Sequence, residues 1–202
     1  MQNPKIKAKL EKFATMQRIK ARKDNKMHYE ILNKIDKSPK FGTKMEIIGK
    51  ENLNAEVLNY ILAKNKRIAI NKLDEKTAKM LDFHYPHDVR RTIQPDEIIH
   101  TLQRHGTDSN LVKFSGQKPV TIDEIAKYQD YADGADIKRT SQDKTKHNVL
   151  ISLKQLDNNF IVVVEQVKKL RNELGFKTMY FEKGRLDEET IERLTSITRK
   201  NA

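Results

Sequence analysis

The strongest strand pattern in this sequence lies between residues 149 and 167. Val149–Lys154 alternates, and Phe160–Val167 is almost continuously apolar. The polar residues Asp157, Asn158 and Asn159 between the two segments are typical of a turn, so the pair predicts a β-hairpin. The face of the first strand that is expected to be apolar consists of Val149, Ile151 and Leu153. A hairpin pairs its strands antiparallel, so we expect an antiparallel sheet in this part of the chain.

A third strand is expected at Phe176–Glu182, followed by a last helix from Asp187. Successive side chains of a strand point to opposite faces of the sheet. The two predicted faces are Phe176, Thr178 and Tyr180 on one side, and Lys177, Met179 and Phe181 on the other. Polar and aromatic residues of this strand are therefore candidates for a site on the sheet.

The residues before the hairpin predict short helices and strands in turn. Met45–Ile48 and Arg67–Asn71 are short apolar segments of the kind that form strands. Asn54–Lys64 has its apolar residues on one side of a helix, and Asp74 is suited to cap the next helix. Together these elements predict the α+β class, with a small antiparallel β-sheet and packed helices over residues 44–202.

The middle of this domain is expected to contain a central helix and a long loop. Pro95 suits the first turn of a helix, where a missing N–H costs nothing, and Gly106 suits the residue just past its end. Thr121–Glu124 is a capping box that opens a further helix. Residues 132–147 are polar and charged, which predicts a mobile loop before the sheet.

The positive charge of the chain is concentrated at its N-terminus. The net charge is +12, of which residues 1–45 hold 13 Lys and Arg against 4 Asp and Glu, and residues 46–202 hold 27 against 24. Residues 5–35 have the pattern of a basic amphipathic helix, which can lie on nucleic acid, an anionic membrane or a partner protein. We therefore predict a basic helical N-terminal extension over residues 1–43.

Several classes of protein are disfavoured by what the sequence lacks. It has no cysteine, so neither a disulfide framework nor a thiolate metal site is available. No segment has the roughly 18 apolar residues of a membrane span, and the first ten residues lack the apolar core of a signal peptide. Motifs for phosphate-binding loops, dinucleotides, nucleophile elbows and metalloproteases are also missing. We expect no cofactor.

Two histidines and an aspartate lie close together in residues 84–88. His84, His87 and Asp88 are the nearest approach to a metal-ligand cluster in the chain. Pro86 lies between the histidines and argues against a helical pair on one face. We expect a loop that packs Tyr85 and Pro86 against the core, and no metal site.

The segment Ile98–Gly106 contains the residues best suited to chemistry. His100 and Arg104 are spaced i, i+4 and share one face of a helix, and His105 follows next to Gly106. Histidine titrates near neutral pH and serves as acid or base, and the arginine fork suits a phosphate. An amphipathic helix that ends in solvated polar residues would show the same pattern, so both interpretations stay open here.

These residue types suit a reaction that needs no metal and whose nucleophile comes from the substrate. RNA cleavage is such a reaction, because the ribose 2′-OH attacks the adjacent phosphate. The protein then supplies a general base, a general acid and a cation. Thr178 and Tyr180 can donate hydrogen bonds to phosphate oxygens, and Tyr180 can instead stack on a base. Both are also ordinary strand residues.

Three motifs in a fixed order carry a resemblance to a known family. They are a helix that ends His-x-x-x-Arg-His-Gly at His100–Gly106, a Pro-Val-Thr-x-x-Glu-Ile helix start at Pro119–Ile125, and a Lys-Thr-Met-Tyr strand at Lys177–Tyr180. Over roughly Met45–Lys183 the chain resembles the phage-associated nuclease domains grouped with barnase, EndoU, colicin and RelE-type ribonucleases. Such domains are often the toxin part of phage head-morphogenesis proteins of the MuF type.

The resemblance implies a helix packed on a small antiparallel sheet, with the active cleft on the sheet face opposite or beside the helix. The catalytic residues that it implies are His100, Arg104, His105, Thr178 and Tyr180. Lys154 and Lys177 are the candidates that it implies for phosphate contact.

The sequence therefore predicts a metal-independent endoribonuclease of toxin type. Its expected partners are RNA (tRNA, rRNA or mRNA) and an immunity or antitoxin protein, and its expected location is the cytoplasm or a phage particle. The alternative is a non-catalytic nucleic-acid-binding or head-associated structural protein that keeps the fold. A DNA nuclease would normally require clustered carboxylates for a metal, and we find none.

Overall fold

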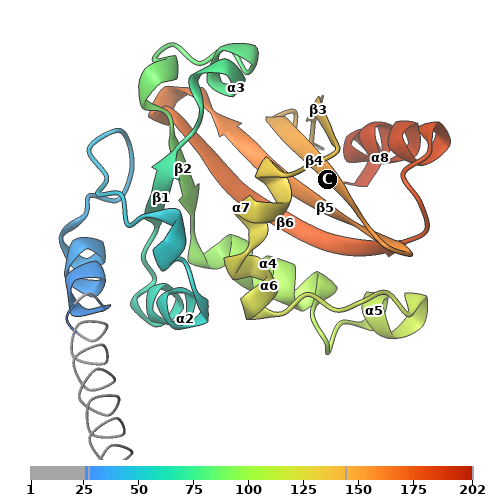
Figure 1. The fold of residues 1–202 in the computed structure, drawn as a ribbon, viewed down its shortest axis with the longest axis horizontal. Coiled ribbons are helices and arrows are strands. Elements are labelled where there is room, and N and C mark those ends of the chain that lie inside the picture. The colour runs from blue at the N-terminus through green and yellow to red at the C-terminus, as the bar shows by residue number, and fades with distance from the viewer. Residues whose placement is uncertain (1–25, 27, 144, 202) are drawn as a thin grey trace, which may run out of the picture. The chain divides into compact units, whose positions relative to one another are not determined.

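We obtained a computed structural model of the chain, which describes residues 26, 28–143 and 145–201, with side chains up to residue 195 (Figure 1). The chain divides into two compact units, Met1–Lys37 and Ser38–Ala202. In the first unit, residues 28–37 are helical, and the rest of the predicted basic helix lies outside the described residues. Everything below concerns the second unit.

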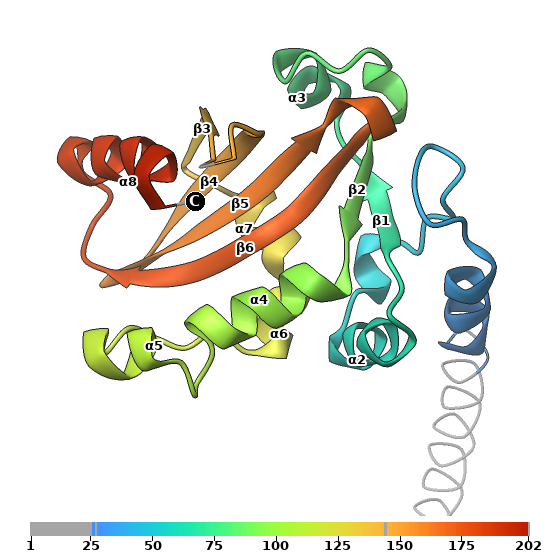
Figure 2. The ribbon, with the colours of Figure 1, turned by 180° about the vertical axis from the view of Figure 1, so that it is seen from behind.

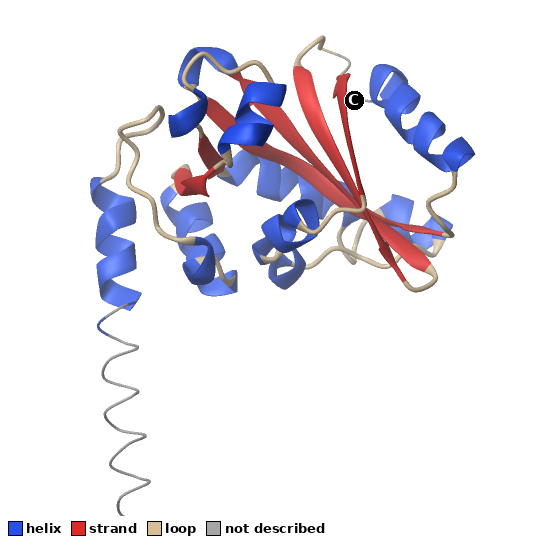
Figure 3. Ribbon diagram, turned by 45° about the horizontal axis from the view of Figure 1, so that its top comes forward, coloured by secondary structure: helices blue, strands red, loops and turns tan. Residues whose placement is uncertain are grey.

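The second unit is built on one six-stranded sheet with the strand order β1-β2-β6-β5-β4-β3 (Figure 3). The strands are β1 (Ile68–Lys72), β2 (Arg90–Ile93), β3 (Ile137–Gln142), β4 (Asn148–Leu156), β5 (Asn159–Lys168) and β6 (Glu173–Lys183). All neighbouring strands are antiparallel except β2 and β6, which run parallel. The predicted α+β class with a mainly antiparallel sheet is confirmed.

Helices cover both sides of this sheet. They are α2 (Ala55–Lys64), α3 (Glu75–Met80), α4 (Pro95–His105), α5 (Asn110–Ser115), α6 (Ile122–Ala126), α7 (Tyr128–Asp133) and α8 (Glu188–Asn201), with short 3-10 turns η1 (Lys50–Asn52), η2 (Pro86–Asp88) and η3 (Lys169–Arg171). Helix α4 packs along β6, and α7 packs on β4 and β5. Figures 1 and 2 show α7 and α4 on opposite sides of the sheet.

The predicted hairpin is present as β4 and β5. Leu156 pairs with Asn159 across a two-residue turn in which Asp157 adopts a left-handed conformation with φ 50°. The predicted apolar face of β4 is fully buried and packs with Leu194 of α8. Leu150 and Ser152 on the other face are buried as well, because helices cover both sides of the sheet.

Helix ends follow the predicted signals. The backbone N–H of Thr77 donates to the carboxylate of Asp74, which caps α3. Thr121 caps α6 by accepting from the N–H of Glu124 at 3.3 Å. The carboxylate of Glu124 does not return to the cap, because it accepts from the side chains of Lys118 and Tyr131 instead.

Four segments differ from the expectation. The predicted loop over residues 132–147 contains β3, a polar strand at the edge of the sheet, and β2 was not predicted. A polar edge strand lacks the apolar alternation that identifies a buried one. The expected strand Met45–Ile48 forms one bridge, between Ile47 and Ala69. Residues 107–120 join two predicted helices, and they include α5, which was not predicted.

The predicted side-chain alternation of β6 is interrupted by an irregularity. Glu165 of β5 pairs with Phe176, whereas the preceding Val164 pairs with Thr178, so Lys177 is an extra residue in β6. Phe176 packs on Tyr128 of α7, while Thr178 and Tyr180 contact α4 on the other side of the sheet. The prediction that Phe176 shares a face with Thr178 and Tyr180 was therefore wrong.

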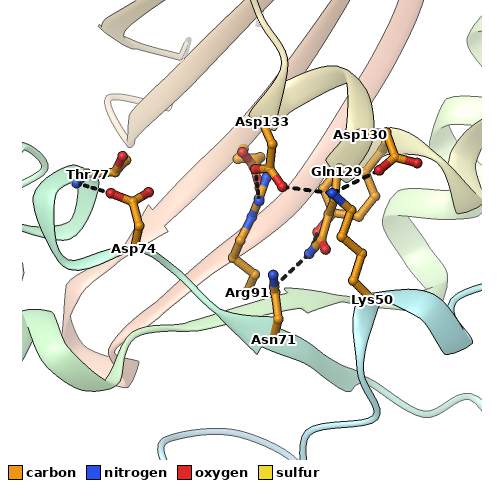
Figure 4. Close-up of polar contacts among 10 residues, drawn as sticks. Lys50, Asn71, Asp74, Thr77, Arg91, Gln129, Asp130 and Asp133 are labelled. Carbon is orange, nitrogen blue, oxygen red and sulfur yellow. Dashed lines mark hydrogen bonds and ion pairs between the residues drawn. The ribbon is translucent and has the colours of Figure 1, made fainter.

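On the α7 side, a buried ion-pair network joins the strands to the helix (Figure 4). Arg91 of β2 donates to Glu165 of β5 at 3.0 Å and also pairs with Asp133 of α7. Lys50 binds Asp133 at 3.0 Å from the outer side. The side chains of Arg91 and Glu165 are 4% and 1% exposed, so this pair is closed to solvent, whereas Asp133 at the outer end of the network is 45% exposed.

Candidate active site

The last turn of α4 is fixed by its C-terminal glycine. The N–H of Gly106 donates to the carbonyl of Leu102 at 2.8 Å, and a Cβ at position 106 would lie 2.3 Å from that oxygen. Its φ of −78° is accessible to any residue, so close approach of the backbone, and not a left-handed conformation, requires glycine here. This contact sets the direction in which the preceding side chains point.

His105 is buried between α4 and the sheet. It is 8% exposed, and its ring stacks on Tyr180 of β6 with 4.9 Å between centroids. Burial lowers the pKa of His105 to about 4, helped by Arg104 and His100. The ring is therefore neutral at neutral pH, and its Nδ1 has no hydrogen-bond partner.

His100 and Arg104 lie on the exposed side of the same helix. Partial burial, then Arg104 and Lys177, lower the pKa of His100 below its usual value. Both neighbouring groups are cations, which disfavour a second positive charge. His100 is therefore an accessible, neutral imidazole near neutral pH.

The polar residues of β6 face this helix. The hydroxyls of Thr101 and Thr178 are 3.3 Å apart and form a hydrogen bond between α4 and β6. Burial raises the pKa of Tyr180, so its phenol stays protonated. The ammonium of Lys177 forms an ion pair with Asp143, which lies in the connection between β3 and β4. The structure thus brings together His100, Arg104, His105, Thr178, Tyr180 and Lys177.

The β3–β4 connection adds groups that the sequence analysis missed. The carboxylate of Asp143 accepts from the backbone N–H groups of Thr145 and His147, each at 2.9 Å, and from the Thr145 hydroxyl at 2.8 Å. Although burial raises it, these bonds and Lys177 lower the pKa of Asp143 to about 2. The Thr145 hydroxyl lies 2.6 Å from Nδ1 of His147.

The hydrogen bonds determine which nitrogen of His147 is available. The single hydroxyl proton of Thr145 goes to Asp143, so the same oxygen accepts a proton from Nδ1 of His147. Nε2 is then the nitrogen left for a ligand. Asp143 and His147 belonged to a predicted loop, and only the tertiary pairing with Lys177, 34 residues away, distinguishes them.

Comparison with known protein families finds a match over the elements that carry these residues. Residues 67–189 match the family model described as phage-Barnase-EndoU-ColicinE5/D-RelE like nuclease3. The chain belongs to this nuclease family. The resemblance drawn from the sequence motifs is confirmed. No curated protein and no solved structure matches the chain.

The matched part of this nuclease-like chain includes all of α4 and β6, and the β3–β4 connection as well. Glu97, one turn before His100, also lies within it. Burial raises the pKa of Glu97, while Lys168, Lys177 and Arg67 oppose the rise. The family match therefore covers every element of this candidate site.

One predicted site residue of this nuclease-family chain lies apart from the others. Lys154 belongs to β4, and its ammonium lies next to Gly134 at the end of α7. A Cβ at Gly134 would be 2.7 Å from that nitrogen. Lys154 therefore does not join the group around Lys177.

The predicted packing of the His84–Asp88 segment was wrong in one respect. Tyr85 is 63% exposed, so it does not pack in the core. Asp88 pairs with Lys72 at 2.6 Å and with Arg90. Among the described residues, no three His, Asp or Glu side chains are arranged to hold a metal ion. No described helix is long and apolar enough to cross a membrane.

Proposed function

We propose that this chain is a metal-independent endoribonuclease of toxin type, which cleaves RNA through attack of the ribose 2′-OH on the adjacent phosphate. The observation that supports it best is the position of Lys177. This cation lies close enough to His100 on α4 to lower its pKa, and it pairs with Asp143, the partner of the Thr145–His147 pair. Family membership supports a nuclease, and this arrangement supports the type that we propose.

Each side chain then has a distinct role. Neutral His100 takes the proton of the 2′-OH, and the 2′-oxygen forms a bond to phosphorus. His147, in its protonated form, gives its Nε2 proton to the 5′-oxygen as the phosphorus–5′-oxygen bond breaks. Lys177 and Arg104 balance the charge that develops on the phosphate, and Thr178 donates to one of its oxygens. The products are a 2′,3′-cyclic phosphate and a 5′-hydroxyl end.

His105 and Tyr180 act as positioning residues in this proposal. The His105 ring is buried, and a pKa of about 4 leaves almost no imidazolium to act as an acid at neutral pH. Its stacking on Tyr180 holds the end of α4 against β6. Because His100 and Arg104 lie on the same helix, this contact also fixes their positions relative to β6.

The experiment is cleavage of total RNA by the full chain in EDTA, followed by analysis of the product ends. We expect cleavage to persist in EDTA and to give cyclic phosphate ends, and His100→Ala to slow it about 10²–10⁴-fold. His84→Ala is the matched control, because His84 is exposed and lies outside the group. Cleavage that stops in EDTA would contradict the proposal.

The biological setting is also part of this proposal. The family is associated with phages. We infer that the nuclease acts in the cytoplasm or is delivered with a phage particle, and that an immunity protein protects its producer. If folded protein leaves tRNA, rRNA and mRNA all intact, the alternative of a nucleic-acid-binding or head-associated structural protein replaces it.

A further inference from the structure

A pocket of about 680 Å³ lies at the N-terminal end of α4, away from His105. Five cationic side chains line it: Lys40, Lys64, Lys66, Arg67 and Arg171. Asp96 is the single acidic residue among the described residues that line it. Phosphate-rich ligands are attracted to such a concentration of positive charge.

A buried carboxylate holds two sides of this pocket in place. The side chain of Glu173 is fully buried, and its Oε2 accepts from Arg67 at 3.0 Å. Its Oε1 accepts from the N–H of Gly42 at 2.8 Å, which fixes the loop that carries Phe41. Because one carboxylate holds both walls, the pocket is a preformed feature and not a chance gap between side chains.

The pocket also offers an aromatic surface. Phe41 is 53% exposed, although a large apolar side chain normally avoids water. The guanidinium of Arg171 lies 4.8 Å from the centre of its ring. Nucleic-acid bases stack on aromatic rings and on arginine planes, and stacking tolerates any base. A cation-lined pocket with such a pair has the two elements that bind single-stranded nucleic acid.

We propose that this pocket binds single-stranded RNA next to the bond that is cut, with phosphates on the lysines and Arg171 and one base stacked on the Phe41–Arg171 pair. This inference rests on the proposed ribonuclease function. Helix α4 has 11 residues, or a length of about 16 Å, and joins the pocket to the residues of the proposed catalytic site. Pro95 and Asp96 line the pocket, and His100 follows one turn further along.

The test is fluorescence anisotropy of a labelled oligo-uridine with 2′-O-methyl riboses, which the chain cannot cleave by 2′-OH attack. The variants are Phe41→Ala and Lys64→Ala/Arg171→Ala in the full chain. The control is Lys76→Ala/Lys79→Ala on the distant helix α3. Arg67 stays unchanged because it pairs with buried Glu173. Thermal denaturation checks that each variant is folded.

We expect Phe41→Ala to weaken binding about 5- to 100-fold, the usual effect of losing one stacked base. The double variant should weaken it at least tenfold and reduce the slope of log affinity against log salt by about 1.4, because two phosphate contacts are lost. The control should change the affinity by less than twofold. The N-terminal arm is common to all variants, so their ratios report on the pocket alone.

Affinities that stay within twofold of wild type in both pocket variants would overturn the proposal. Failure of the ribonuclease proposal would give a different set of results. If wild type binds the oligonucleotide through the pocket but cleaves no RNA, the pocket stands and the catalytic proposal fails. If RNA is cleaved at the wild-type rate by both pocket variants, and they bind normally, the catalytic site stands without this pocket.

Discussion

The two faces of the sheet each carry a buried carboxylate paired with a cation, and the two pairs differ in what surrounds them. On the α7 face, Arg91 binds Glu165 and Asp133, and its guanidinium also lies over Tyr128. On the α4 face, Lys177 binds Asp143. The side chain of Arg91 is 4% exposed, whereas that of Lys177 is 24% exposed.

Exposure and neighbouring groups separate a structural ion pair from a candidate catalytic one. Arg91 is itself buried and pairs with carboxylates from β5 and α7, so it fixes the geometry of β2, β5 and α7. Lys177 has one ion-pair partner among the described residues, Asp143, which also contacts the exposed His147. Lys177 also lowers the pKa of the exposed His100. A buried carboxylate alone therefore does not mark an active site. A partly exposed cation close to acid–base groups is better evidence of an active site.

The largest effect is expected on the closed face. Arg91→Ala leaves Glu165 buried without a partner, which should lower the free energy of unfolding by about 3–5 kcal/mol. Urea denaturation measures this directly. Arg91→Met/Glu165→Met, which removes both charges, should recover most of the loss. A loss of under 1 kcal/mol in the single variant would show that the network is not structural.

The next largest effect concerns pH. The pKa of His105 is about 4 in the folded protein and about 6.5 when unfolded, so only the unfolded state takes up a proton between these values. The free energy of unfolding should therefore fall as pH drops from 6.5 to 4, by up to about 3 kcal/mol. Asp143 has a lowered pKa in the folded protein, so its protonation reduces stability only below about pH 3.8. The effect of Asp143 therefore lies at lower pH than the effect of His105.

His105→Phe is the matched variant for this measurement, because it keeps a ring against Tyr180 and removes the titration. Its unfolding free energy should be flatter between pH 6.5 and 4 than that of wild type. An unchanged slope in the variant would show that His105 is not the group responsible.

The smallest effect is at the contact between α4 and β6. Thr101→Val removes the hydroxyl that bonds to Thr178 and should cost about 1 kcal/mol in unfolding free energy. Thr107→Val, an exposed change just beyond the same helix, is the control. Equal stability of the two variants would mean that this hydrogen bond does not hold α4 on the sheet.

Local patterns predicted most elements that present the site. The hairpin, both ends of α4 and the strand that contains Thr178 and Tyr180 follow from alternation, caps and turn residues, which act over a few positions. The family resemblance also grouped His100 with Thr178, and the structure places both on the α4 side of the sheet. These features depend on neighbouring residues in the chain or belong to a motif of the family, so the sequence alone predicts them.

The missed features depend on contacts between distant residues. Asp143 and His147 lie in a polar segment, and only the pairing with Lys177 shows their importance. The irregularity at Lys177 comes from the register between β5 and β6, which sequence alternation does not reveal. The family resemblance implied Lys154 for phosphate contact, and strand geometry places it beside Gly134 instead.

The most direct test of the account compares RNA cleavage in EDTA by wild type, Lys177→Met and Lys169→Met. Lys169 is a partly exposed lysine paired with Asp82, outside the site. We predict that Lys177→Met slows cleavage at least about 10²-fold and that Lys169→Met leaves it unchanged. Lys177→Met/Asp143→Asn repeats the test without an unpaired buried carboxylate. Wild-type cleavage by folded Lys177 variants would contradict the central claim that this lysine lies at the catalytic centre.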